Sequence, residues 1–165
     1  MRIIKLGIIS LIVFALLITG ISLFFPSHIR ISKAIDINAA KDSVMSQINN
    51  PVNWKKWFPG ADTSDFVMIE GKVKGIGIGE MQGLMITEIN DSSVLTGSIG
   101  PKSKSSESGW NIFDGSRPNT ITVQWYMDFH LRWYPWEKFS SLLLEKRYGP
   151  MMEQGLDNLK NLLEK

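Results

Sequence analysis

Few residues of this chain have the types and spacing that catalysis requires. The sequence contains no cysteine and only two histidines, His28 and His130, which lie far apart. Cysteine nucleophiles and cysteine-based zinc sites are thereby excluded, and no H-x-x-x-H pair is present to begin a zinc site. A G-x-S-x-G segment, which carries the serine of many hydrolases, is also missing. We therefore expect no catalytic residue, no metal and no cofactor.

A glycine-rich segment and several carboxylates are the remaining candidates for chemistry. The glycines of 75–79 (GIGIG) lack the G-x-G-x-x-G spacing of a dinucleotide loop, and strand-like residues follow them, so they indicate a turn or bulge. Two carboxylates meeting in a cavity could shift each other's pKa and act as acid and base. Strand carboxylates more often lie on the solvated face of a sheet, which is the interpretation we favour here. The candidates are Glu70, Glu80, Glu88, Asp114 and Asp128.

Aromatic residues are more informative than polar ones. Trp54 and Trp57 lie three residues apart, on one side of an expected helical turn, where they either cap the end of the core or form a cavity mouth. The segment 132–138 (RWYPWEK) combines aromatic and basic side chains that favour the level of lipid headgroups. Its candidates for contact with a membrane surface are Arg132, Trp133, Tyr134 and Trp136. An ordinary turn that packs aromatic side chains over the last helix is the alternative.

The N-terminal segment predicts a membrane span. Residues 6–25 contain no charge, and at about 1.5 Å per residue they extend roughly 30 Å, the thickness of a bilayer core. The apolar run is longer than that of a typical signal peptide and ends in Leu23-Phe24-Phe25 rather than in small residues, so a retained anchor is favoured over a cleaved signal. The short N-terminus carries Arg2 and Lys5, which favours a cytoplasmic N-terminus and an extracytoplasmic domain.

The residues after the span predict one α+β domain. A strand is expected at 28–38, short helices at 39–49 and 51–57, and strands at 66–70, 77–83, 84–90, 94–99, 110–113 and 119–131. The segment 102–108 predicts a solvated loop. An amphipathic helix is expected from Trp136 to the end, with a kink or a short break at Gly149-Pro150. This order predicts an antiparallel sheet wrapped around the last helix. The formal net charge of +2 gives no basic field for nucleic acid.

Three segments carry a resemblance to a known family. They are 35–39 (IDINA), 53–57 (NWKKW) and 155–160 (GLDNLK). They are similar to the opening strand, the W-x-x-W of the second helix and the closing G-L-x-x-L-K of the START-like superfamily, specifically the bacterial polyketide cyclase/dehydrase-like (SRPBCC) proteins. The chain departs from the family in 72–79, which is short and lacks a tryptophan often found there, so the size of a cavity is open.

The resemblance implies a helix-grip fold, in which a curved sheet and a long C-terminal helix enclose an apolar cavity for a hydrophobic molecule or lipid. We expect a transmembrane anchor over 1–27 and the START-like domain over 28–165, in a bacterial inner membrane. The residues expected to line the cavity are Met85, Trp110, Phe113, Trp125, Met127, Phe129, Met152 and Leu156.

Two other functions stay open at this point. The first is a cyclase/aromatase- or hydrolase-like enzyme on the same fold, which needs polar groups converging in the pocket. The second is an envelope module that binds a protein and whose cavity is vestigial. The sequence identifies neither a ligand nor a protein partner.

Overall fold

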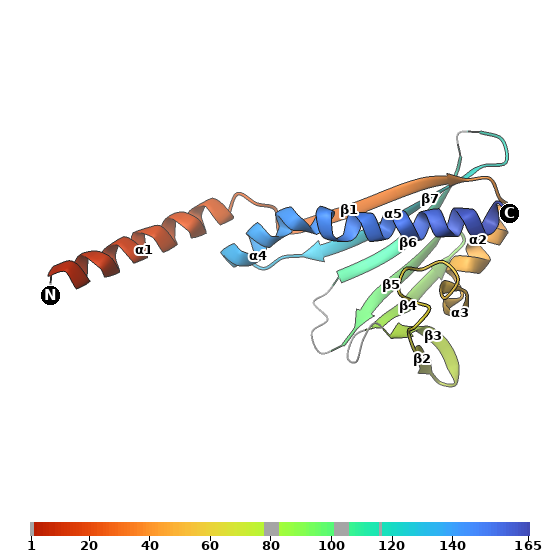
Figure 1. Ribbon diagram of the computed structural model, residues 1–165, viewed down its shortest axis with the longest axis horizontal. Helices are drawn as coiled ribbons and strands as arrows, with labels where there is room; N and C mark the ends of the chain where they lie inside the picture. The colour runs from red at the N-terminus through yellow and green to blue at the C-terminus, as the bar shows by residue number, and fades with distance from the viewer. Residues whose placement is uncertain (1, 78–82, 101–105, 116) are drawn as a thin grey trace.

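A computed structural model of the protein describes residues 2–77, 83–100, 106–115 and 117–165. The first element, α1 (Arg2–Ser22), projects from the rest of the molecule as a rod (Figure 1). It begins and ends a few residues earlier than the apolar run of 6–25. After Ser22 the chain continues through Leu23, Phe24 and Phe25 in turns, and Pro26 separates it from the first strand.

The remainder forms one seven-stranded antiparallel sheet. Its strands are β1 (His28–Ile37), β2 (Phe66–Ile69), β3 (Lys72–Gly77), β4 (Gly83–Asn90), β5 (Ser93–Ile99), β6 (Ser106–Asp114) and β7 (Ile121–His130). The spatial order is β1-β7-β6-β5-β4-β3-β2, so β1 and β2 occupy opposite edges. The chain passes from one edge to the other through α2 (Lys41–Ile48) and α3 (Pro51–Trp54). From β2 onward each strand pairs antiparallel with the next strand along the chain.

The C-terminal region is helical but is interrupted at a different place from the one expected. It comprises α4 (Pro135–Ser140), the 3₁₀ turn η1 (Ser141–Leu143) and α5 (Leu144–Leu163). The Ser141 hydroxyl donates a hydrogen bond to the Lys138 carbonyl at 2.6 Å, a local bond that competes with α-helical geometry. No short break occurs at Gly149-Pro150, because α5 runs through both residues, and the proline removes only one backbone donor from the helix. The alternative expectation of a kink there stays a prediction.

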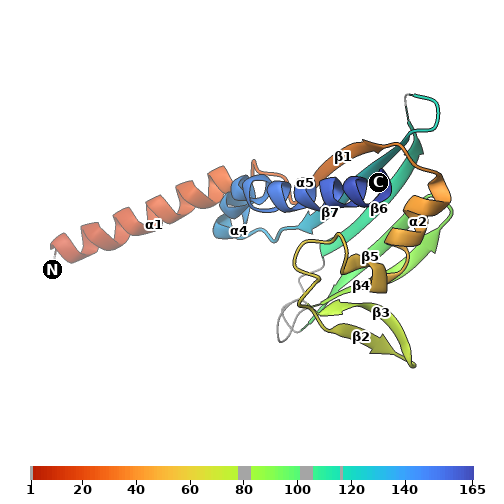
Figure 2. The ribbon, with the colours of Figure 1, turned by 45° about the vertical axis from the view of Figure 1, so that its right-hand side comes forward.

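One face of the sheet, here called the inner face, is covered by α2, α3 and α5 (Figures 1 and 2). The alternation expected for the last strand is present, since β7 turns Ile121, Val123 and Trp125 toward the helices. Bulges at Lys74 of β3 and Thr87 of β4 shift the alternation locally. The architecture is that of a helix-grip α+β fold, with the long helix α5 lying along β1.

Two parts of the middle of the chain differ from expectation. The strand expected at 77–83 lies largely outside the described residues, and the observed strand β3 precedes it, joined to β2 by a tight turn at Glu70 and Gly71 with φ values of 51° and 74°. In the expected loop 102–108, residues 102–105 lie outside the described residues, whereas Ser106–Ser108 already belong to β6.

Candidate ligand-binding site

Five aromatic side chains fill the end of the inner face that lies farthest from α1, and we call them the distal cluster. The Trp110 and Trp125 rings lie 5.5 Å apart, and Phe58 lies 5.1 Å from Trp125. Trp54 and Trp57 approach Trp110 to 5.5 and 5.8 Å, measured between ring centroids. All five side chains are buried. The protein's own side chains therefore occupy this part of the interior.

The two tryptophans of 53–57 are fixed by α2 and α3. Asn50 caps α3 by accepting a hydrogen bond from the Val52 N–H, and Pro51 takes the first helical position. The indole of Trp54 donates to the Ile48 carbonyl at 2.7 Å, and that of Trp57 to the Gln47 carbonyl at 3.3 Å. Their exposed fractions are 0% and 1%. This is the arrangement expected of side chains that cap the end of the core, so we place neither at an open mouth.

The long helix approaches the sheet closely over the distal cluster because it has a glycine there. A Cβ atom built on Gly155 would lie 2.7 Å from Trp125 Cζ3 and 3.0 Å from Pro59 Cδ, closer than side chains normally pack. Met152 and Leu156 flank Gly155 and are buried against the same rings. Gly155 belongs to the segment 155–160 that carried the family resemblance, and its physical role is this close contact.

The end of the inner face nearer to α1 is less completely covered, and we call it the proximal half. The side chains of Met127, Phe129, Tyr148 and Met151 pack against the core but are only half-buried. The rings of Phe129 on β7 and Tyr148 on α5 lie 5.1 Å apart, so strand and helix converge here. Ile31, on the edge strand beside α5, is buried in this region. The proximal half thus presents apolar side chains whose burial is incomplete.

Buried polar groups lie between the distal cluster and the proximal half. Thr96 donates from its hydroxyl to the Ser108 carbonyl at 2.9 Å, and the Ser108 hydroxyl donates to the Tyr126 carbonyl at 2.9 Å. The Trp125 indole in turn donates to the Ser108 hydroxyl at 3.0 Å. By contrast, Trp110 Nε1 has no partner in the described part of the chain. These contacts fix the Trp125 ring in place.

The eight residues predicted to line a cavity fall into three groups. Trp110, Trp125, Met152 and Leu156 belong to or flank the distal cluster, whereas Met127 and Phe129 lie in the proximal half. Met85 and Phe113 are placed on the opposite, outer face of the sheet, and we correct their assignment accordingly. Phe113 pairs with Thr122, alternates with the buried Ile112 and is 52% exposed. Met85 alternates in the same way with the buried Leu84.

Several residues of the inner face were not predicted from the sequence. Phe58 directly follows the W-x-x-W segment. Tyr148 precedes Met152 by one helical turn, so helical spacing from Met152 could have identified Tyr148. Thr96 and Ser108 lie opposite each other on β5 and β6. The pairing of two strands across different parts of the chain gives no local signal in a single sequence.

Most described groups with displaced pKa values lie on the outer face. Arg30 donates from Nε and Nη2 to the two carboxylate oxygens of Asp128, at 2.8 and 2.6 Å, and these hydrogen bonds lower the pKa of that carboxyl. Burial raises the pKa of Tyr126, over whose ring the Arg30 guanidinium lies at 4.5 Å. His28 Nε2 lies 3.3 Å from Asp128 Oδ1, and its ring stacks on that of His130. This network stabilises the pairing of β1 with β7.

The carboxylate candidates do not assemble inside the protein. Glu70, Glu88 and Asp114 are exposed, Asp128 is held on the outer face, and Glu80 lies outside the described residues. Lys33, whose pKa is raised chiefly by its hydrogen bond to Glu145, joins β1 to Glu145 and Glu153 of α5 at 2.6 and 2.8 Å. Across the described ranges, no group of three or more His, Asp or Glu side chains could hold a metal ion.

The aromatic segment beside α4 forms an exposed stack. The Tyr134 ring lies 4.8 Å from the rings of both Trp133 and Trp136, and the two tryptophans are 60% and 66% exposed. Arg132 is exposed, and its backbone N–H donates to Glu137 Oε2 at 2.9 Å. The aromatic side chains therefore stack on one another, and their contact with a membrane stays a prediction. Close by, α1 is long and apolar enough to cross a bilayer, with a mean hydropathy of 2.5.

The comparisons with known proteins decide which family this arrangement represents. A model of the family described as polyketide cyclase/dehydrase and lipid transport matches residues 28–164. The chain belongs to this family. The resemblance found in the sequence is thereby confirmed, and the description of the family favours a domain that binds hydrophobic molecules. Among curated proteins, none matches the chain.

Solved structures of low sequence identity share the fold. A START superfamily protein from Mycobacterium smegmatis has 14% identity and a TM-score of 0.61, covering 82% of this chain and 97% of its own. A protein from Nitrosospira multiformis has 12% identity and a TM-score of 0.62, covering 82% and 96%. An uncharacterised protein from Bacillus thuringiensis has 14% identity and a TM-score of 0.59, covering 83% and 100%. At such identities the likeness concerns the fold alone.

Proposed function

We propose that this member of the polyketide cyclase/dehydrase and lipid transport family is a membrane-anchored domain that binds a hydrophobic molecule or lipid without transforming it. The observation that carries the proposal is the change along the inner face, from a fully buried aromatic cluster to half-buried apolar side chains in the proximal half. A ligand that covers those side chains would gain about 25 cal/mol for each Å² of apolar surface removed from water.

In this proposal the two regions have different roles. The distal cluster forms the closed end of the site, where the Trp125 indole is held by its hydrogen bond to Ser108. Met127 and Phe129 of the predicted lining, together with Tyr148 and Met151, supply the ligand-contacting surface. A non-catalytic role is favoured because, among the described residues, the displaced pKa values belong to groups on the outer face and to Lys33, which is engaged in ion pairs with Glu145 and Glu153 of α5.

A direct test is to identify the small molecules retained by residues 28–165, purified without detergent, using mass spectrometry. Met127→Trp, which fills the proximal half, should abolish retention, and Phe113→Trp on the outer face is the matched control. No retained apolar molecule in the unsubstituted domain would contradict the proposal. A retained molecule that is chemically altered on incubation would instead favour the enzyme alternative.

We further propose that α1 is a signal anchor in a bacterial inner membrane, with the domain on the extracytoplasmic side. Arg2 and Lys5 precede the apolar run, and basic residues beside a membrane span tend to stay in the cytoplasm. Because the chain has no cysteine, a single Asp157→Cys variant offers one reporter thiol on the exposed face of α5. A membrane-impermeant maleimide should label it in intact spheroplasts, and labelling only after lysis would place the domain inside.

A further inference from the structure

A shallow groove lies where the helical turn η1 meets α5, at the end of the domain next to α1. Its volume is about 460 Å³, and it is lined by Ser140, Leu143, Leu144, Lys146 and Arg147. The lining therefore combines two apolar side chains, two cations and a hydroxyl. Groups of these kinds complement an amphiphilic anion, in which an apolar part and a negative charge lie close together.

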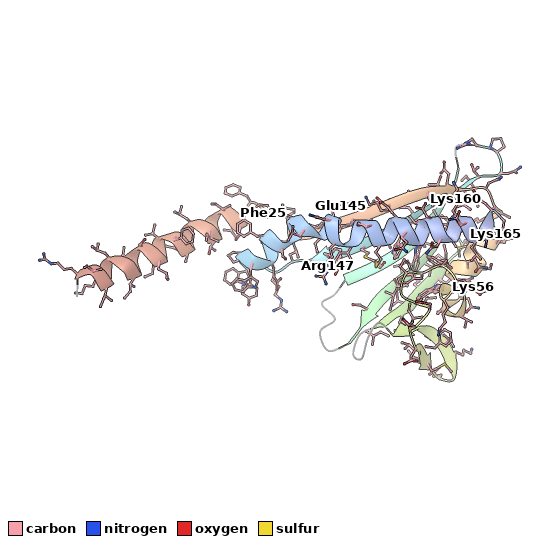
Figure 3. All side chains as sticks on the ribbon, in the orientation of Figure 1. Phe25, Lys56, Glu145, Arg147, Lys160 and Lys165 are labelled. Atoms are coloured by element: carbon pink, nitrogen blue, oxygen red, sulfur yellow. The ribbon has the colours of Figure 1, made fainter. Side chains whose placement is uncertain are left out.

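The two cations of the groove have no acidic partner among the described residues. Neither Lys146 nor Arg147 takes part in an ion pair there, and both side chains are exposed. The neighbouring carboxylate, Glu145, points toward β1 and pairs with Lys33 at 2.6 Å. Figure 3 shows Glu145 and Arg147 projecting from different sides of α5. The positive charge at the groove is consequently available to an anion from outside the protein.

The groove is held at a fixed place relative to the end of α1. Lys138 of α4 is 3% exposed and donates to the Phe25 carbonyl at 3.0 Å and to the Ser27 hydroxyl at 2.6 Å. The rings of Phe25 and Phe139 meet edge to face at 5.4 Å. These contacts join α4 to the residues that follow α1, so the orientation of the groove is set by α1 and not by a free linker.

The surface around the groove has the composition of a membrane interface. Large apolar side chains are exposed here on neighbouring elements, and basic residues accompany them. They are Trp133, Trp136, Leu142 and Leu143. In the headgroup layer, such tryptophans and leucines would be covered by lipid while the cations stay near the phosphates.

We propose that the groove binds the headgroup of an anionic phospholipid from the membrane leaflet at which α1 ends. Lys146 and Arg147 pair with the phosphate, and Leu143 and Leu144 contact the first carbons of the acyl chains. The inference rests on the membrane anchoring proposed above, and it names the lipid class. Leu144 also packs against the core, one helical turn before Tyr148, so the groove is continuous with the proximal half of the inner face.

The test uses the full chain in detergent micelles supplemented with either phosphatidylglycerol or phosphatidylcholine, with bound lipids counted by native mass spectrometry. The chain should retain phosphatidylglycerol selectively. The variant Lys146→Gln/Arg147→Gln should bind it more weakly, by about 5-fold for each charge removed. The matched control is Lys56→Gln/Lys165→Gln, which removes the same charge at the opposite end of the domain, as Figure 3 shows. This control should bind like the unsubstituted chain.

A second variant perturbs the groove while both of its cations are kept. Leu143→Asp places an anion in the groove on an exposed turn, and it should weaken phosphatidylglycerol binding without changing the unfolding temperature. Equal retention of the two lipids, or an equal loss in the control pair, would overturn the inference. If Met127→Trp leaves the retained lipid unchanged while the groove variants release it, the lipid site in the groove is supported and the proposed ligand binding in the proximal half is contradicted.

Discussion

The two ends of the inner face differ in how completely their apolar side chains are buried. In the distal cluster, five aromatic rings and the close contact at Gly155 exclude solvent with the protein's own side chains. In the proximal half, Met127, Phe129, Tyr148 and Met151 stay half-buried although the same strand and the same helix carry them. In the proposed function, the fully buried end supports the site and the half-buried end, next to α1, contacts the ligand.

The largest expected effect concerns the distal cluster. Trp110→Ala should lower the free energy of unfolding by about 3–5 kcal/mol, because a fully buried ring is replaced by a cavity. The substitution breaks no hydrogen bond among the described residues, so the loss reports packing alone. Phe129→Ala, in the proximal half, should cost clearly less because its ring is already partly hydrated. Urea unfolding of residues 28–165 measures both. Equal costs would remove the distinction between the two regions.

A second prediction concerns what holds the proximal half together. Asp128→Asn should lower the free energy of unfolding by about 2 kcal/mol at pH 7, since it removes the charge-assisted hydrogen bonds from Arg30. Because those bonds lower the pKa of Asp128 in the folded protein, the stabilisation is present above the usual pKa of the carboxyl and is lost as the pH falls below about 4.

Hydrogen exchange as a function of pH locates this effect. On acidification, the amides around Ile29 and Phe129 should lose protection before those around Trp110 and Val123, whose packing is apolar. The Asp128→Asn variant should show little of this pH dependence. If the distal strands open first in the unsubstituted chain, the polar network of the outer face does not stabilise the proximal half.

Two glycines of α5 provide a matched pair with a smaller effect. Gly155→Ala should destabilise the domain by about 1–3 kcal/mol, because the new methyl group meets Trp125 and Pro59 at 2.7 and 3.0 Å. Gly149→Ala meets only the flexible ends of Glu145 and Lys33, at 3.2 and 3.3 Å. There the higher helix propensity of alanine should offset the contact or stabilise the helix by up to about 1 kcal/mol. Thermal unfolding of both variants distinguishes the tight end of α5 from the looser one.

The smallest effect is expected on the outer face. Phe113→Ser should lower the free energy of unfolding by about 1 kcal/mol, since about half of the side chain is exposed. It should also leave ligand retention unchanged. A loss of retained ligand in this variant would mean that the site is not where the inner face places it.

The sequence predicted elements well where the pattern was local and repeated. The alternation of β7 identified Trp125, Met127 and Phe129 as one face, and the apolar spacing of α5 identified Met152 and Leu156. The segments 35–39, 53–57 and 155–160 led to the correct family and fold. Each of these signals depends on a few neighbouring residues, which a single sequence displays directly.

The placement of site residues failed where it required strand register. Trp110 and Phe113 are three residues apart, a spacing that unites side chains on a helix but separates them on a strand, so they could not both line the interior. The bulge in β4 and the tight turn at Glu70-Gly71 decide the register of the middle strands, and neither follows from hydropathy. Which end of the inner face is filled depends on contacts between α3, β6 and α5, which only the folded chain brings together.

The link between Lys138 and the residues after α1 has a mechanical consequence. A transmembrane helix adapts to a thinner bilayer by tilting. With Lys138 bonded to Phe25 and Ser27, the domain would lean with the helix as one lever, and the aromatic stack of Trp133, Tyr134 and Trp136 would be pressed toward the lipids or lifted away from them. The contact between these aromatic side chains and the lipids would then depend on the thickness of the bilayer.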